Sequence, residues 1–165
     1  MFRRKSFAIS ALIAQSLLAA SLHAQAPVEK VHLVFTGGPN AGTYDAVGTR
    51  GGCSANATGP GSFGNQLSDP KGEPTKFNSL QLIVPDAKKA ASGTTEFQVI
   101  FGFGPVMHRT REYAVNTLPE TKKKVGSGTV KVTQTGAAAT IDIAAVTADG
   151  VKITGTINCL TVKRM

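Results

Sequence analysis

An all-β fold is predicted by three segments of alternating apolar and polar residues at the end of the chain, by the turn residues between them, and by the lack of a long helical pattern. The segments are Gly128–Gly136, Ala139–Val146 and Val151–Val162. Asp149-Gly150 separates the last two, and Asp-Gly between alternating runs is a strong hairpin signal because Gly adopts the positive φ of the turn. We therefore expect a C-terminal three-strand antiparallel meander.

Residues 1–24 are predicted to be a cleaved signal peptide. Arg3, Arg4 and Lys5 precede an apolar run from Phe7 to Ala20, and small residues up to Ala24 supply a cleavage site. The run is shorter than the roughly 20 apolar residues of a spanning helix. We expect a secreted or periplasmic protein with one domain, residues 25–165, and no transmembrane anchor.

The rest of the chain adds short strands rich in Val, Ile, Thr and Phe, as strand propensity predicts. The expected strands are Lys30–Thr36, Thr43–Val47, Phe77–Val84, Thr95–Phe101 and Arg111–Asn116, with less regular ones around Cys53 and at Ser62–Leu67. Turn residues separate most of them, and we expect about eight or nine short strands in all.

The connecting segments favour a β-sandwich. Pro85–Ala91 is expected to form one or two helical turns, too few to cover a parallel sheet. Gly102–Arg109 is expected to be a loop, which places Phe103, like Phe63, on the loop side. Uneven strands and the irregular Gly48–Gly64 segment favour an antiparallel β-sandwich, with a small β-barrel as the alternative.

The two cysteines, Cys53 and Cys159, are expected to form one disulfide. An even cysteine count in an exported chain is typical of a disulfide-bonded protein. A zinc site is disfavoured because there is no Cys-x-x-Cys pair. The bond would tie the irregular Gly48–Gly64 region to the last strand.

Positive charge is the main surface feature. Without the signal peptide, the chain has 15 Lys and Arg against 10 Asp and Glu, a net charge of +5. The candidate residues for binding an anionic partner are Arg109, Arg111, Lys122, Lys123 and Lys124; Lys88-Lys89 and Lys163-Arg164 are further basic pairs. Alternatively, such lysines keep strand edges from pairing with other chains. Nucleic acid is a disfavoured partner because no aromatic residues are interleaved around Lys122.

No catalytic residue is assigned from the sequence. The serines lack a Gly-x-Ser-x-Gly motif, and the ten acidic residues are scattered. A small exported hydrolase that uses strand-borne carboxylates, such as Asp45, Glu96 or Glu112, is one alternative.

A copper-binding periplasmic protein is a second alternative. Its ligands would be His32, Met107 and His108, since imidazole and thioether suit copper. We otherwise expect no cofactor. The chain has no Trp and two Tyr, which disfavours a carbohydrate-binding aromatic platform.

The interpretation that we favour is an exported, non-catalytic binding or interaction module at the cell envelope. It depends on the expected signal peptide, the disulfide, the basic clusters and the missing catalytic motif. The partner would be an anionic envelope component or another protein. The residues alone do not identify it, because a fold does not imply a function.

We expect the protein recovered from its native compartment to begin at Gln25. Its intact mass should lack two hydrogens that reduction restores, because Cys53 and Cys159 are paired. An uncleaved chain, or two thiols that alkylate without reduction, would contradict this expectation.

Overall fold

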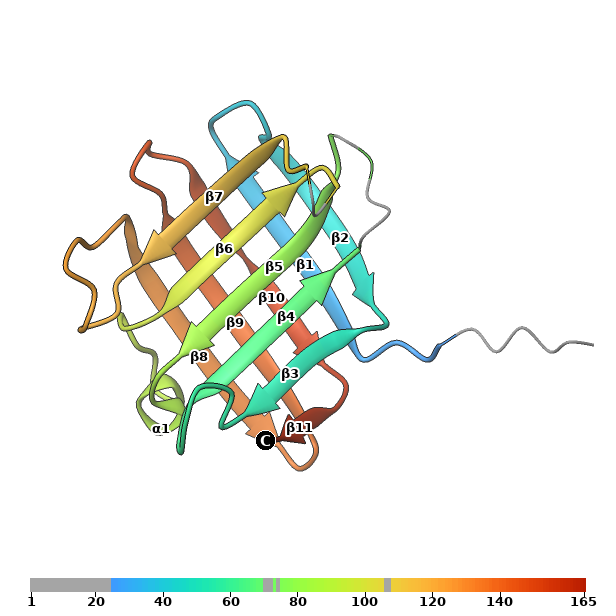
Figure 1. Ribbon diagram of the computed structural model, residues 1–165, viewed down its shortest axis with the longest axis vertical. Helices are drawn as coiled ribbons and strands as arrows, with labels where there is room; N and C mark the ends of the chain where they lie inside the picture. Colours follow the sequence, from blue (N-terminus) through green and yellow to red (C-terminus); the bar gives the residue numbers. More distant parts are fainter. Residues whose placement is uncertain (1–24, 70–72, 74, 106–107) are drawn as a thin grey trace, which may run out of the picture.

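The computed structural model describes residues 25–69, 73, 75–105 and 108–165, and these form two β-sheets packed face to face (Figure 1). The predicted signal peptide lies outside the described residues. The elements are β1 (Glu29–Thr36), β2 (Gly42–Gly48), β3 (Gly51–Ala55), β4 (Phe63–Ser68), β5 (Phe77–Val84), α1 (Ala87–Ala90), β6 (Gln98–Phe103), β7 (Arg111–Asn116), β8 (Ser127–Thr135), β9 (Ala138–Val146), β10 (Lys152–Cys159) and β11 (Val162–Arg164).

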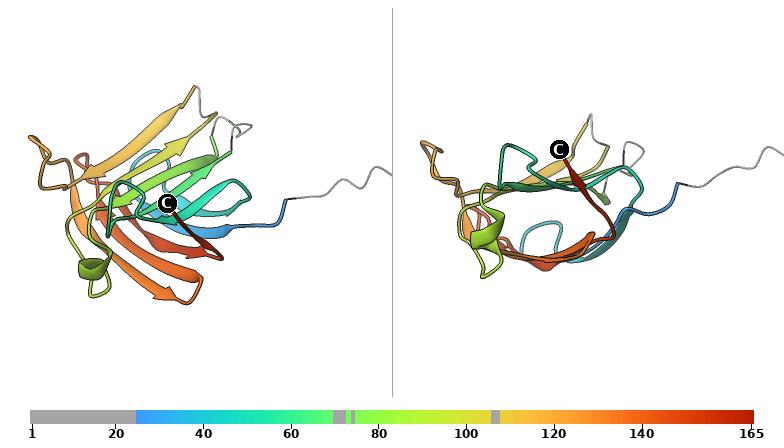
Figure 2. Two further views of the ribbon diagram at one scale, coloured as in Figure 1. Left: turned by 60° about the horizontal axis from the view of Figure 1, so that its bottom comes forward. Right: turned by 90° about the horizontal axis from the view of Figure 1, so that it is seen from below.

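The architecture confirms the predicted all-β sandwich. One sheet has five strands in the order β2-β1-β10-β9-β8, and the other has six in the order β11-β3-β4-β5-β6-β7. Figure 2 shows the two sheets as separate layers, so the sandwich and not the closed barrel is formed. The predicted C-terminal meander is β8-β9-β10, with Asp149-Gly150 between its last two strands.

The described residues form eleven strands where the sequence predicted eight or nine. The expected last strand, Val151–Val162, is two strands, because the chain leaves the five-stranded sheet after Cys159. It crosses to the other sheet, where β11 pairs in parallel with β3. The alternation in fact ends at this crossing, because Val162 falls out of the period of two that Ile153, Ile157 and Cys159 share, and the prediction did not use this break.

The prediction of a loop at Gly102–Arg109 was wrong for its first two residues. Strand β6 continues to Phe103, which is fully buried and pairs with Phe77 of β5. Phe63 is likewise a buried residue of β4. Conversely, the strand expected from Thr95 begins at Gln98, because Thr94 pairs instead with Val130 of β8.

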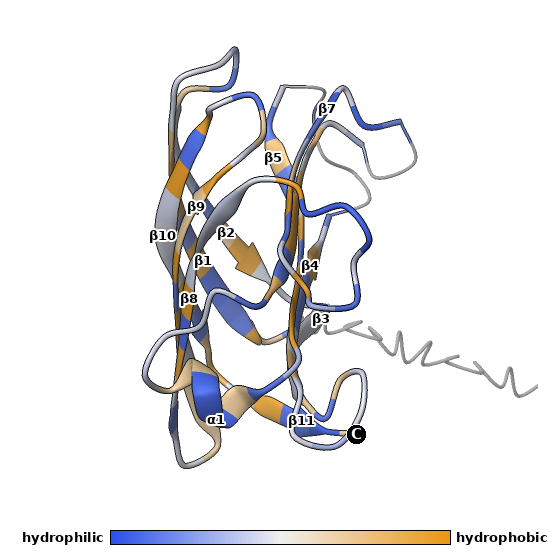
Figure 3. Cartoon of the chain, turned by 90° about the vertical axis from the view of Figure 1, so that its left-hand side faces the viewer, coloured by the Kyte–Doolittle hydropathy of each residue, from blue (hydrophilic) through white to orange (hydrophobic). Residues whose placement is uncertain are grey.

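Aromatic side chains fill the core between the sheets. Phe35 of β1 makes edge-on contacts with Phe101 and Phe103 of the opposite sheet, with ring centroids 5.5 and 5.3 Å apart. Tyr44 and Tyr113 complete the cluster, and the hydroxyl groups of both bond to Asn40. Edge-to-face aromatic pairs stabilise beyond their buried area. Figure 3 shows the apolar residues alternating with polar ones along both layers.

The predicted helical segment is α1, a single turn that Asp86 caps. The carboxylate of Asp86 accepts hydrogen bonds from the backbone N–H groups of Lys88 and Lys89. Ala90 is buried, and the turn packs against β8. Among the described residues, no helix has the length and apolar character needed to cross a membrane.

Cys53 and Cys159 form the expected disulfide, and it joins the two sheets. Cys53 lies in β3 of the six-stranded sheet and Cys159 at the end of β10 in the five-stranded sheet, with a Cα–Cα distance of 5.8 Å. Both residues are buried. The separation of 106 positions makes this a long loop closure, for which the chain-entropy model gives the largest stabilisation.

Replacing both cysteines with alanine should lower the free energy of unfolding by about 4 kcal/mol, because the open chain gains entropy. Urea unfolding of the oxidised protein and of the double variant measures the difference. Reductant should destabilise the wild type and leave the double variant unchanged. A loss below about 1 kcal/mol would show that the packing of the sheets alone sets the stability.

Candidate functional site

The outer faces of the two sheets differ in charge. The outer face of the five-stranded sheet carries Lys30, His32, Asp45, Lys131, Asp142 and Lys152. On the six-stranded sheet, the outward positions of β3 to β6 are uncharged. They are Gly52, Ser54, Gly64, Gln66, Ser68, Ser79, Gln81, Ile83, Gln98, Ile100 and Gly102.

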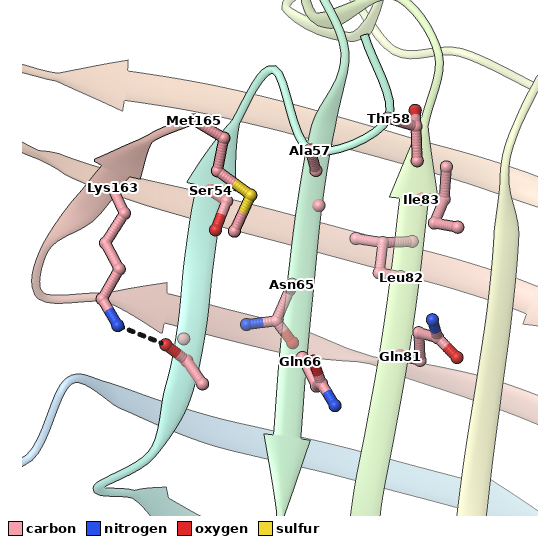
Figure 4. Close-up of a pocket in the computed structure, with 13 residues that line it drawn as sticks. Ser54, Ala57, Thr58, Asn65, Gln66, Gln81, Leu82, Ile83, Lys163 and Met165 are labelled. Atoms are coloured by element: carbon pink, nitrogen blue, oxygen red, sulfur yellow. Dashed lines mark hydrogen bonds between the residues drawn. The ribbon is translucent and has the colours of Figure 1, made fainter.

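The uncharged face is hollowed into a groove of about 260 Å³ over β3, β4 and β5 (Figure 4). Gln66 and Gln81 are directly opposite each other on β4 and β5 and bring two exposed carboxamides to the groove. Ile83 and Met165 add apolar surface, and the side chain of Met165 is 75% exposed. The groove thus combines hydrogen-bonding and apolar groups without a negative charge.

Glycines form the end of the groove nearest to the β2–β3 turn. Gly51 and Gly52 have φ angles of 81° and 86°, which favour glycine. A Cβ at Gly51 would overlap the carbonyl oxygen of Gln66, so the two strands approach each other closely only because this side chain is missing. The backbone of β3 therefore forms part of the groove surface.

Strand β11 carries Lys163, the only cationic residue among the described residues that line the groove. The Nζ atom of Lys163 donates to the carbonyl oxygen of Gly51, at 3.3 Å. Lys163 is opposite Ser54 in the parallel β11–β3 pairing, and both residues line the groove. The crossing of the chain after Cys159 therefore supplies the ammonium group at this edge.

A buried carboxyl group, Glu29, lies behind the groove. Glu29 continues the inward-facing row of Val31, Leu33 and Phe35 on β1, and its side chain is fully buried. It accepts a hydrogen bond from Nδ2 of Asn65, which also lies 3.2 Å from Sγ of Cys53. Burial raises the pKa of Glu29 to about 7, although the hydrogen bonds from Asn65 and the Gly52 backbone lower it.

The basic residues proposed for anion binding do not form one cluster. Arg109 and Arg111 lie at the start of β7, whereas Lys122, Lys123 and Lys124 follow its end (Figure 1). Arg109 forms an ion pair with Glu112, and the guanidinium carbon of Arg111 lies 5.7 Å from the ring centroid of Tyr113. The three lysines are exposed in the β7–β8 connection.

The proposed copper ligands are not brought together by the described residues. His32 points outward from the five-stranded sheet, where its Nδ1 lies 2.7 Å from Oδ1 of Asp45. His108 belongs to the β6–β7 connection of the other sheet, and Met107 lies outside the described residues. Within the described ranges, no group of three or more His, Cys, Asp or Glu could hold a metal ion.

The carboxylates of the hydrolase alternative are also dispersed. Asp45 pairs with His32 on the five-stranded sheet, Glu96 lies 3.5 Å from Lys89 of α1, and Glu112 pairs with Arg109 at the start of β7. General acid and base groups act on one bond and must flank it. These three acids are in three different places and do not form such a pair.

Sequence reasoning missed Glu29, Gln66 and Gln81. Glu29 lies two residues before Val31, in the same inward-facing row as Leu33 and Phe35. The alternation in the sequence could therefore have predicted its burial. The glutamines became a pair only through the β4–β5 register. Comparison of this chain with protein-family models, curated proteins and solved structures found no match.

The stability of the protein should fall as the pH rises from about 4.5 to about 7, because folded Glu29 keeps a proton that the unfolded chain has lost. Below this window both states are protonated, and above it both are ionised, so the contribution of Glu29 is then constant. A shift of this size corresponds to roughly 3 kcal/mol.

Glu29→Gln removes the proton but keeps the shape of the side chain, so it should abolish this part of the pH dependence. Urea unfolding of both proteins at several pH values between about 5 and 8 gives the stability of the wild type minus that of the variant. The contributions of the other titrating groups are the same in both proteins and cancel in this difference. A difference that stays constant across this range would contradict the assignment to Glu29.

Proposed function

We infer that this protein is an exported, non-catalytic interaction module that binds a protein partner at the cell envelope through the outer face of its six-stranded sheet. The observation that carries the proposal is the absence of charge from the outward positions of β3 to β6. The cores of protein interfaces are depleted of charged residues and enriched in residues such as Met.

The face is large enough to form the central part of a protein interface. Six strands at a spacing of about 4.8 Å, with about six residues each, give a sheet of roughly 24 by 20 Å, against the roughly 800 Å² that each partner buries in a standard interface. Gln66 and Gln81 are exposed on it, and Ser68, Ile83, Gln98 and Ile100 are half-buried. Charged groups lie toward its edges, with Lys163 on β11 and with Glu112 on β7, whose ion-pair partner Arg109 covers Gly102 of β6, as in the polar rim of an interface.

Export is supported by the inter-sheet disulfide, because disulfides persist in oxidising compartments. The predicted signal peptide in residues 1–24 agrees with this location. A non-catalytic role is supported by the dispersion of Asp45, Glu96 and Glu112.

Gln81→Lys should reduce recovery of the partner at least about tenfold, because it buries an unpaired charge at the centre of the interface. The immobilised wild type and variant would be compared in capture from envelope extracts, with bound proteins identified by mass spectrometry. Gln81 is exposed, so the variant should unfold at the same temperature as the wild type.

Asn158→Lys is the matched control, since Asn158 is an exposed carboxamide on the outer face of β10 in the other sheet. A protein retained by this control and lost with Gln81→Lys supports the proposal. Equal recovery by all three proteins would exclude the uncharged face as the interface. Sedimentation of the pure protein shows whether the bound partner is a second copy of the chain.

A further inference from the structure

The buried Glu29 is bonded directly to the groove. Its Oε2 atom accepts a hydrogen bond from the side chain of Asn65, and the backbone of Gly52 lies near enough to lower the pKa of the carboxyl group. Both of these residues line the groove on the six-stranded sheet. Glu29 itself belongs to the five-stranded sheet, where it pairs with Gly48 and Cys159. A change at this carboxyl group therefore acts directly on Gly52, an outward position of β3, and on the inward side chain of Asn65.

Two buried acceptor atoms at Glu29 and Asn65 have no hydrogen-bond donor among the described residues. Among the described residues, Oε1 of Glu29 and Oδ1 of Asn65 are buried and have no hydrogen-bond partner. An ionised carboxylate and an amide oxygen are both acceptors, whereas a protonated carboxyl group has one O–H donor. A proton on Glu29 removes the buried charge and supplies the donor type that this pair of side chains needs.

Within the part of the chain that the structure describes, the elements packed against Glu29 provide no compensating charge. They present Gly48 from β2, the Cys53–Cys159 disulfide from β3 and β10, and Asn65 from β4. Lys163 lies across the β3 backbone and bonds to the Gly51 carbonyl. Lys30 and Asp45 are directed to the outer face of the five-stranded sheet, and Arg50 bonds to Gln25 at the β2–β3 turn. An ionised Glu29 must therefore recruit water or move.

Movement of Glu29 cannot leave the groove unchanged. A Cβ at Gly48 would overlap the Glu29 carboxyl, so the side chain lies directly against the β2 backbone. On the other side are the backbone of Gly52 and the side chain of Asn65, which donates a hydrogen bond to it. Water that enters, or a carboxylate that turns toward solvent, would break the contacts of Glu29 with Asn65 and the Gly52 backbone. Packed elements of this kind shift between discrete arrangements.

We propose that Glu29 is a proton-operated switch beneath the groove: its protonated form holds the Gly51–Gly52 bend in the arrangement described here, and loss of the proton loosens it. The consequence for binding rests on the proposed function of the six-stranded face. The partner would bind the protonated form more tightly, and by reciprocity its binding would strengthen the hold of Glu29 on the proton.

Amide NMR spectra of the wild type, recorded from about pH 5 to about pH 9, test the switch without a ligand. The amide signals of Gly51, Gly52 and Gln66 should shift together with a midpoint near pH 7, and these shifts should be missing in Glu29→Gln. The Cδ resonance of Glu29 in carbon-labelled wild type gives the same midpoint even if the variant does not fold. Titration of Cδ near pH 4.5, or groove signals that do not follow it, would overturn the proposal.

The partner captured on the wild type provides a separate readout. If only the protonated form binds, the affinity of the partner for the wild type should be about tenfold weaker at pH 8 than at pH 6. Its affinity for Glu29→Gln should be the same at both pH values. One possible outcome is that the groove amide signals titrate together with Glu29, but that no captured protein is lost with Gln81→Lys. This outcome would support the switch and reject the proposed interface. Partner binding through Gln81 with the same affinity at both pH values would overturn the link between the proton and binding.

Discussion

The bond between Cys53 and Cys159 fixes the strand that has the least side-chain surface of its own. Strand β3 begins with Gly51 and Gly52, which contribute no side chain to the core, so packing alone holds its start weakly. The disulfide attaches it to β10, inside the well-patterned meander. Glu29, Asn65 and the groove are all built around this attachment, and the candidate site depends on it.

The two ends of β1 are held in different ways. At its end, Phe35 contacts aromatic rings of both sheets, and burial of large apolar surface dominates. At its start, Glu29 replaces an apolar residue in the same inward row and depends on hydrogen bonds near the disulfide. Polar interactions in a low dielectric respond strongly to a single proton, whereas aromatic packing does not. The candidate switch lies at the polar end for this reason.

The alternation of apolar residues was sufficient to predict the fold class, most strands and the final meander, because a half-buried sheet imposes a period of two. It did not predict β11, which pairs with β3 of the other sheet only after the chain has crossed over behind Cys159. The site was harder to predict. Gln66 and Gln81 are ordinary surface residues until the register places them together, and the burial of Glu29 depends on β3 and β4, which are distant in sequence.

The position of β1 has a consequence for how the chain acquires its structure. Strand β1 lies between β2 and β10, and Glu29 pairs with Cys159. During synthesis β1 can pair with β2, but its other partner, β10, is missing until almost the whole chain has been made. Pairings so distant in sequence require a large loop to close before they stabilise anything, and such topologies fold slowly. The five-stranded sheet therefore cannot be completed until the last strands have emerged, whereas β4 to β7 pair with their neighbours in sequence.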